Sequence, residues 1–197
     1  MKKTIATTLA LLLFTTHSAA DMAEGIKAYE QGDYAKALNE FTIEARRGNP
    51  AAQNNLGVMY AIGEIVKRDL RTAAKWYEKA AEQGLALAQY NLGVLYEEGL
   101  GVVQDIPTAA VWFRLASEQG DVLAQHRLGL LLAKGVGIKR DNGEAYFWLS
   151  LVAGATTDEI LRTEALDIRL EVEKRMSQKE VVDAELLVGN WRKKTDF

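Results

Sequence analysis

The chain has 197 residues, of which 24 are basic and 27 acidic, and 48% of its residues are hydrophobic. Its net charge of −3 argues against nucleic acid as a partner, because that binding depends on Lys and Arg neutralising phosphates. It has no cysteine and only two prolines, so the composition favours a helical protein held together by its core without disulfides.

The first twenty residues have the pattern of a secretory signal peptide. Two lysines precede an apolar run that is densest over residues 9–14, and the small residues Ser18 and Ala20 stand before a cut ahead of Asp21. A membrane anchor is the alternative, but the run is shorter than the ~20 residues needed to span a bilayer. We therefore expect loss of residues 1–20, a mature charge of −5, no membrane span in the mature chain and a periplasmic location, with full secretion left open.

A 36-residue period organises most of the remaining chain. The segment WYEKAAEQG at residues 76–84 returns as WFRLASEQG at residues 112–120, and the same spacing holds at many other positions. Periods of this length are typical of solenoids built from stacked helix pairs. The aligned sets include Gln53, Gln89 and Gln125; Gly57, Gly93 and Gly129; Gly63, Gly99 and Gly135; Asp69, Asp105 and Asp141; and Trp76, Trp112 and Trp148.

Each period reads as two helices joined by a glycine-bearing loop. In residues 86–121, apolar residues recur at helical spacing on both sides of EEGLGVVQD. The loop residues Gly99 and Gly101 can adopt positive φ, and Asp105 can cap the second helix. Gly93 lies inside the first helix, where glycine costs about 1 kcal/mol. We expect this glycine to permit close approach of the paired helix.

The two ends of the array differ from its middle. Residues 21–50 carry the helix-pair pattern without the long loop. After residue 156 the pattern changes to one long helix over 157–174. The segment SQKE at residues 177–180 is a capping box that opens a final helix to about Trp191. We expect residues 157–197 to close the array, because terminal repeats are usually atypical caps.

Residues 86–121 resemble the Sel1-like repeat (SLR), a relative of the tetratricopeptide repeat with a longer loop between its helices. The matching positions are Ala88, Leu92, Gly93, Tyr96, Gly99, Gly101, Val102, Asp105, Ala109, Trp112, Phe113, Ala116 and Gly120. The resemblance implies an all-α, right-handed α/α solenoid of helix-pair repeats with a C-terminal helical cap. Its expected parts are a tetratricopeptide-like repeat at 21–50, three SLRs within 51–156 (about 50–85, 86–121 and 122–156) and a cap at 157–197.

Two departures from the family pattern affect this expectation. Ile65 replaces the second loop glycine of the first full SLR, so we expect that loop to be strained or differently shaped. Leu132 replaces the aromatic residue found at Tyr60 and Tyr96. Secreted enzyme-like relatives carry a disulfide in each repeat, and the absence of cysteine weakens that analogy.

No constellation of catalytic residues is apparent in the sequence. His126 is the only histidine after residue 20, and a zinc site built from one histidine and carboxylates would be atypical. Phosphate-binding, dinucleotide-binding and nucleophile-elbow motifs are missing. We expect a protein that is not an enzyme and binds no metal or cofactor. The tryptophans Trp76, Trp112 and Trp148 are interpreted as core residues, with an aromatic ligand site as the alternative.

The partner-binding face can be predicted from the repeat register. In tetratricopeptide-like stacks the first helix of each unit lines the concave side, and positions at fixed offsets from the repeated glycine are interpreted as facing outward. Mixed apolar, aromatic and polar surfaces are typical of partner grooves. Packing between helices is the alternative, above all for Val58, Val94 and Leu130. The predicted partner-binding residues are Tyr29, Asn54, Val58, Tyr90, Val94, Glu97, His126, Leu130 and Lys134.

The resemblance implies a scaffold that binds another protein or peptide through its concave face. Exported bacterial members resemble adaptors, regulators or assembly factors of envelope systems. One alternative is a structural subunit of an envelope machine such as a flagellar motor ring. The other is a cell-wall-directed hydrolase, which would need catalytic groups that the sequence lacks.

Overall fold

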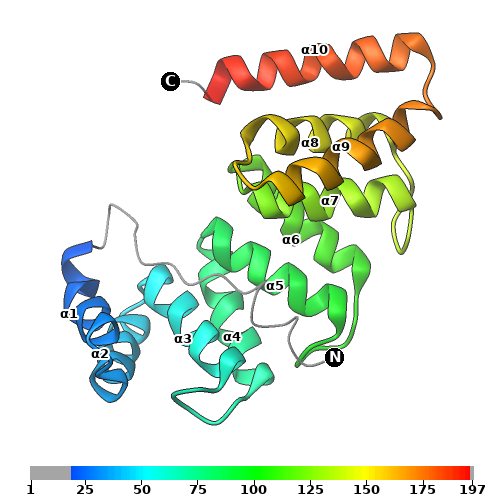
Figure 1. The fold of residues 1–197 in the computed structure, drawn as a ribbon. Helices are drawn as coiled ribbons and strands as arrows, with labels where there is room; N and C mark the ends of the chain where they lie inside the picture. Colours follow the sequence, from blue (N-terminus) through cyan, green and yellow to red (C-terminus); the bar gives the residue numbers. More distant parts are fainter. Residues whose placement is uncertain (1–18, 196–197) are drawn as a thin grey trace. The chain divides into compact units, whose positions relative to one another are not determined.

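The computed structural model describes residues 19–195, and every regular element within that range is an α-helix (Figure 1). The predicted signal peptide lies outside the described residues except for its last two, which begin the first helix. Within the described range no helix is both long and apolar enough to cross a bilayer. The helices are α1 (Ala19–Glu30), α2 (Tyr34–Arg46), α3 (Pro50–Ile62), α4 (Leu70–Glu82), α5 (Ala86–Glu98), α6 (Ile106–Glu118), α7 (Val122–Lys134), α8 (Asn142–Ala155), α9 (Glu159–Glu173) and α10 (Gln178–Thr195).

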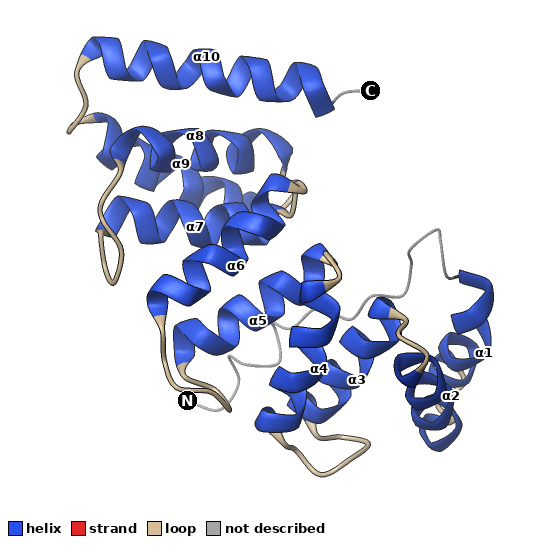
Figure 2. Ribbon diagram, turned by 180° about the vertical axis from the view of Figure 1, so that it is seen from behind, coloured by secondary structure: helices blue, strands red, loops and turns tan. Residues whose placement is uncertain are grey.

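The described residues form an all-α helical repeat solenoid that divides after Asp105 into two compact units (Figure 2). In the first unit, α1 packs on α2, α2 on α3, α3 on α4 and α4 on α5. In the second, α6 packs on α7 and α7 on α8, and both α9 and α10 pack on α8. The division falls between the two helices of the 86–121 period, so neither compact unit is a whole number of repeats.

Polar side chains define where most helices begin. A side-chain oxygen accepts a hydrogen bond from a free backbone N–H at the start of α2, α3, α4, α7, α8 and α9. These caps satisfy donors that the helix itself leaves unpaired. The capping residues are Asp33, Asn49, Asp69, Asp121, Asp141 and Asp158.

The capping box predicted at residues 177–180 is confirmed. The Ser177 N–H donates to Glu180 Oε2 at 2.7 Å, and the Glu180 N–H donates to Ser177 Oγ at 3.3 Å. These reciprocal bonds satisfy two N–H groups at the start of α10. The helix that follows ends at Thr195, four residues beyond the predicted end at Trp191.

Glycines inside the first helices hold the helix pairs close together, as predicted. A Cβ atom added at Gly57 of α3 would lie 2.5 Å from Cε1 of Tyr77 on α4, and one at Gly129 of α7 would lie 2.9 Å from Cγ of Leu149 on α8. Gly25 of α1 is in the same situation, 2.7 Å from Cε1 of Phe41. It lies 32 residues before Gly57, four short of the period, because residues 31–33 connect α1 to α2 whereas residues 63–69 connect α3 to α4.

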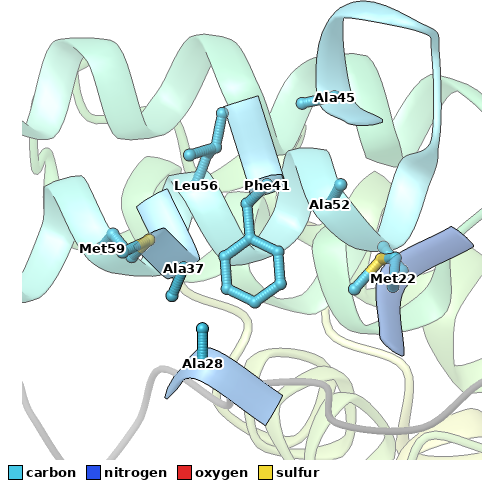
Figure 3. Packing of buried hydrophobic residues seen from close by; sticks show 9 residues of the cluster. Met22, Ala28, Ala37, Phe41, Ala45, Ala52, Leu56 and Met59 are labelled. Atoms are coloured by element: carbon cyan, nitrogen blue, oxygen red, sulfur yellow. The ribbon is translucent and has the colours of Figure 1, made fainter. Parts of the chain in front are cut away.

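Phe41 occupies the centre of the core formed by α1, α2 and α3 (Figure 3). Side chains from all three helices surround its ring, and the buried members of this cluster are Met22, Ala28, Ala37, Phe41, Ala45, Ala51, Ala52, Leu56 and Met59. Ile65 packs against the same cluster. No described non-glycine residue has positive φ, so the 63–69 loop is differently shaped at Ile65 without the strain that a left-handed isoleucine would carry.

One buried hydrogen bond recurs with the 36-residue period. The Nε2 atoms of Gln53, Gln89 and Gln125 donate to backbone carbonyls eight residues earlier, at 3.1, 3.1 and 3.2 Å. The acceptors are Ala45, Ala81 and Ser117, near the ends of α2, α4 and α6. Each of these carbonyls also accepts from the backbone N–H of the glycine three residues later, Gly48, Gly84 or Gly120, so the glutamine supplies a second hydrogen bond at the end of the preceding helix.

The interpretation of the periodic tryptophans as core residues is confirmed only for Trp148, which is buried. Trp76 and Trp112 are partly exposed, and the fully buried aromatic in each case is the next residue, Tyr77 or Phe113. Trp76 lies at the edge of the Phe41 cluster, where the Lys79 ammonium is 4.5 Å from its ring centroid. An amphipathic indole suits such a half-buried position better than it suits the centre of a core.

Candidate partner-binding site

The nine residues predicted to bind a partner lie on four first helices. The first six belong to the compact unit of α1–α5 and the last three to that of α6–α10. They are Tyr29 on α1; Asn54 and Val58 on α3; Tyr90, Val94 and Glu97 on α5; and His126, Leu130 and Lys134 on α7.

The predicted exposure is wrong for five of the nine. Asn54, Val58, Tyr90, Val94 and His126 are buried, with exposed fractions between 0% and 7%. A surface residue that anchors a partner must be reachable in the free protein, so these five do not line an open face. Their part in partner binding stays a prediction without the exposure on which it was based.

A buried hydrogen bond explains the error at Asn54. The Asn91 side chain of α5 donates from Nδ2 to Asn54 Oδ1 of α3 at 3.0 Å. The position three residues before the repeated glycine therefore faces the first helix of the next repeat. The hydrogen bond offsets the burial of Oδ1, whereas the buried Nδ2 of Asn54 has no hydrogen-bond partner, at a cost of about 1–3 kcal/mol.

The equivalent position of α7, two periods later, faces a different kind of neighbour. His126 Nε2 lies 3.7 Å from Glu164 Oε2 of α9, and Nε2 has no hydrogen-bond partner. Burial lowers the pKa of the His126 imidazole, Glu164 opposes that shift, and Arg127 and Lys134 add to it. His126 thus lies neutral beside a half-exposed carboxylate at physiological pH.

Glu164 also lines an open groove between α7 and α9. It has a volume of about 790 Å³, within the range of ~300–1,000 Å³ found for ligand pockets. Two predicted partner-binding residues, Leu130 and Lys134, line its α7 side. The α9 side is formed by Glu159, Ile160, Thr163, Glu164, Asp167 and Ile168.

The groove combines apolar and acidic side chains. Leu130, Ile160 and Ile168 provide apolar surface, and Ile160 is 81% exposed. Three carboxylates against the single cation Lys134 make the lining net negative. These features fit a ligand that carries both apolar and basic groups.

Two contacts hold α9 in place beside α7 and α8. Leu149 and Val152 of α8 form a buried cluster with Ala165 of α9, against which Ile168 packs. Arg175, just after α9, donates from Nη1 to the Ala133 carbonyl in the last turn of α7 at 3.0 Å. The middle and the C-terminal end of α9 are therefore held while the surface between α7 and α9 stays open.

The α9 residues of the groove were missed because they lie beyond the last repeat. Register could be transferred between repeats, but α9 has no equivalent to align. One signal was available in the sequence: Ile160 shares a helical stripe with Glu164 and Asp167. That stripe lies apart from the core-facing Leu161, Ala165 and Ile168 of the same helix.

Tyr29 and Glu97 also remain accessible in part. Tyr29 packs edge-on against Tyr34, with 5.3 Å between ring centroids, and lies beside Ile65 of the differently shaped loop. Burial raises the pKa of its hydroxyl. Glu97 is half-buried near the end of α5.

A second depression in the same compact unit is built around an ion pair. Arg114 of α6 forms a salt bridge with Glu144 of α8, which also accepts from Trp148 Nε1 at 3.1 Å. Burial raises the pKa of the Glu144 carboxyl, but the hydrogen bonds from Arg114 and Trp148 outweigh it and hold the pKa below its usual value. Because both charges are already paired, this site is less suited to a ligand than the α7/α9 groove.

No group of three or more His, Cys, Asp or Glu side chains in the described range is arranged to hold a metal ion.

Comparison with known proteins relates the repeats to a family. The model of the Sel1 repeat matches residues 50–85, 86–121 and 122–153, which together are more than half of the chain. No curated protein sequence matches the chain.

Two solved structures are similar to the chain. One is a Sel1 repeat protein from Oxalobacter formigenes, with a TM-score of 0.66 and 29% identity over 86% of this chain and 74% of that one. The other is a protective antigen of uropathogenic Escherichia coli that displays an SLR fold, with a TM-score of 0.57 and 30% identity over 90% of this chain. The chain spans 46% of that antigen's structure.

Proteins built from these repeats generally mediate protein–protein interactions. The matched repeats, the stacked helix pairs and the related structures lead to one assignment: the chain belongs to the Sel1 repeat family.

Proposed function

We propose that the chain is an exported scaffold that binds a basic, partly apolar segment of another protein in the α7/α9 groove. The observation that carries this proposal is the exposed Ile160 beside Glu159, Glu164 and Asp167, facing Leu130 across the groove. The export pattern at residues 1–20 supports a periplasmic location and a role as an envelope adaptor or regulator.

The apolar part of the groove supplies most of the expected affinity. Covering a side chain such as Ile160 removes apolar surface from water, and each Å² is worth roughly 25 cal/mol. Only part of this appears as affinity, because the bound segment loses conformational freedom. A short segment in this groove is therefore expected to bind reversibly, as suits an adaptor.

The acidic part of the groove supplies selectivity. Glu164 and Asp167 attract a segment that carries Lys or Arg and repel one that carries Asp or Glu, whereas Glu159 is already paired with Arg162 at 2.7 Å. Because Glu159 and Glu164 are exposed, their attraction is screened by salt. Binding is therefore expected to weaken as the salt concentration rises, while a dominantly apolar contact would persist.

Site-specific photocrosslinking in the native cell envelope tests this proposal. A photoreactive amino acid at Thr163, inside the groove, should capture one partner that the same probe at Val111 on α6 does not capture. Equal capture at both positions, or none at Thr163, would place the contact elsewhere on the chain.

A charge reversal on the same helix provides the matched control. Asp167→Lys should weaken capture at least tenfold, whereas Glu171→Lys, also exposed on α9 but outside the groove, should leave it unchanged. A short amphipathic peptide with lysines, compared with the same peptide carrying glutamates, should show the same preference by fluorescence anisotropy. Tighter binding of the glutamate peptide would contradict the proposed ligand chemistry.

A further inference from the structure

His126 is a buried titratable residue beside the α7/α9 groove, although it does not line the groove itself. The residue is 7% exposed, and its Nε2 atom is buried without a hydrogen-bond partner. Glu164 Oε2 of α9 lies 3.7 Å from this nitrogen, beyond hydrogen-bond distance. Because buried polar atoms are normally paired, a buried ring nitrogen that faces a carboxylate without bonding to it requires an explanation.

Glu164 connects this nitrogen to the groove. Its side chain is half-exposed and lines the groove, while its Oε2 atom faces His126. A surface carboxylate can change rotamer at little cost, so a rotation of Glu164 can bring Oε2 within hydrogen-bond distance of a protonated Nε2. The charge of His126 therefore decides whether this carboxylate is directed at the groove or at α7.

The surroundings of His126 keep it neutral near pH 7. Burial, above all, and the cations Arg127 and Lys134 of α7 lower the pKa of the imidazole, and Glu164 of α9 opposes them. The described parts of α6 and α8, which also pack on α7, add no charged group to this set. Histidine is ordinarily the side chain that titrates between pH 5 and 8, and this one is the only histidine of residues 19–195. Its charge therefore changes on acidification below its ordinary pKa of 6.5.

We propose that His126 regulates the α7/α9 groove through Glu164. Neutral His126 leaves the Glu164 carboxylate to a basic ligand, whereas protonated His126 pairs with that carboxylate and weakens the binding. This inference rests on the proposed function, because it concerns the same ligand at the same groove. His126 acts as a positioning residue for Glu164 and does not itself touch the ligand.

The pairing removes the net negative charge of the groove. Glu159 is already in an ion pair, so Glu164 and Asp167 supply the excess of negative charge over Lys134. Once Glu164 is paired with His126, Asp167 and Lys134 balance each other. The apolar lining is unchanged by protonation, so acidification is expected to weaken the binding of a basic segment without abolishing it.

Protonation of His126 and ligand binding are linked, so each affects the other. A basic ligand at Glu164 withdraws the carboxylate that stabilises the charged imidazole, so bound ligand lowers the pKa of His126 further. If protonation weakens binding about threefold, saturating ligand lowers that pKa by log 3, or about half a pH unit. The two quantities can be measured separately and must agree.

Binding of the short amphipathic lysine peptide at a series of pH values tests this regulation. By fluorescence anisotropy, its dissociation constant should rise about threefold or more between pH 7.5 and 5.0. This rise should be absent in His126→Gln, whose side chain takes up no proton. A matched peptide with glutamine in place of each lysine should show no such rise, because it does not compete for Glu164. A rise of the same size in His126→Gln would assign the pH dependence to other groups and overturn the inference.

The ring signals of His126 in NMR spectra give a second measurement, made on the wild-type protein. The chain has two histidines, His17 and His126, and the signal that is absent from His126→Gln identifies His126. Saturating lysine peptide should lower the pKa of His126 by about half a pH unit. Glu164→Gln should lower this pKa without peptide, because it removes the carboxylate that favours protonation. A pKa that the peptide leaves unchanged would overturn the inference.

Failure of this inference can be distinguished from failure of the proposed function. A lysine peptide that does not bind at pH 7.5 would overturn both. A lysine peptide that binds equally well at pH 7.5 and 5.0 would overturn only the regulation by His126 and leave the groove as the binding site.

Discussion

Asn54 and His126 occupy the same repeat position two periods apart, yet their surroundings differ. Asn54 of α3 is fully buried, and Asn91 of the next repeat donates a hydrogen bond to its Oδ1. His126 faces α9, which is no longer a repeat helix and offers a half-exposed carboxylate. The comparison shows that one regular helix closes against the next, and that an open groove forms where the regularity ends.

Among the substitutions that test how one helix closes against the next, we expect the largest loss of stability at the glycine of the α3–α4 pair. Gly57→Ala places a Cβ 2.5 Å from the Tyr77 ring, so the α3–α4 pair must separate. We expect a loss of about 1–3 kcal/mol in the free energy of unfolding, as for other overpacked cores. Urea unfolding followed by circular dichroism measures it.

Gly189→Ala is the control for this substitution. In the described part of the chain nothing lies within 4 Å of its Cβ, so the alanine should raise the free energy of unfolding by about 0.5–1 kcal/mol through helix propensity. Equal losses at Gly57 and Gly189 would show that close helix approach is not the reason for the interior glycines.

The next largest loss of stability is expected at the buried amide pair of Asn54 and Asn91. Asn54→Ala removes the acceptor of the Asn91 Nδ2 bond and should cost about 1–3 kcal/mol, because a buried donor loses its partner. The loss should shrink in an Asn91→Ala background, since the donor is then absent as well. Additive losses in this double-mutant cycle would show that the two side chains are not coupled.

The regular part of the fold was predictable because the same repeat sequence occurs three times in register. Helix pairs, loop positions and the interior glycines follow from the period, and the capping box at Ser177 needs only local sequence. Exposure was not predictable in the same way. The offsets that mark a concave face could not reveal that Asn91 of the next repeat would cover Asn54. Only the α7 side of the groove could be predicted. Leu130 and Lys134 follow from the repeat register, whereas Ile160 belongs to α9, which has no equivalent repeat to align.

The capping box gives a smaller and more local effect. Ser177→Ala removes the Oγ that accepts from the Glu180 N–H and should cost about 1 kcal/mol. Because α10 is the last helix and packs on α8, the loss should appear first as faster amide exchange in the first turn of α10. Unchanged exchange there, with wild-type stability, would mean that the box does not hold the start of the helix.

The smallest expected effect is a dependence of the folding stability on pH that arises from His126. Burial lowers the pKa of the folded imidazole below its unfolded value, while Glu164 on α9 opposes this and Arg127 and Lys134 on α7 reinforce it. As pH falls below about 6.5, the unfolded chain therefore takes up a proton that the folded chain resists. Stability should fall with acidification in wild type and fall less in His126→Gln, as measured by urea unfolding at a series of pH values. Glu164→Gln should steepen the wild-type loss, because it removes the group that favours the charged imidazole. A loss that is equally steep in His126→Gln would assign the acid sensitivity to other groups, such as the Glu144 carboxyl, whose depressed pKa makes its stabilising contribution disappear only at lower pH.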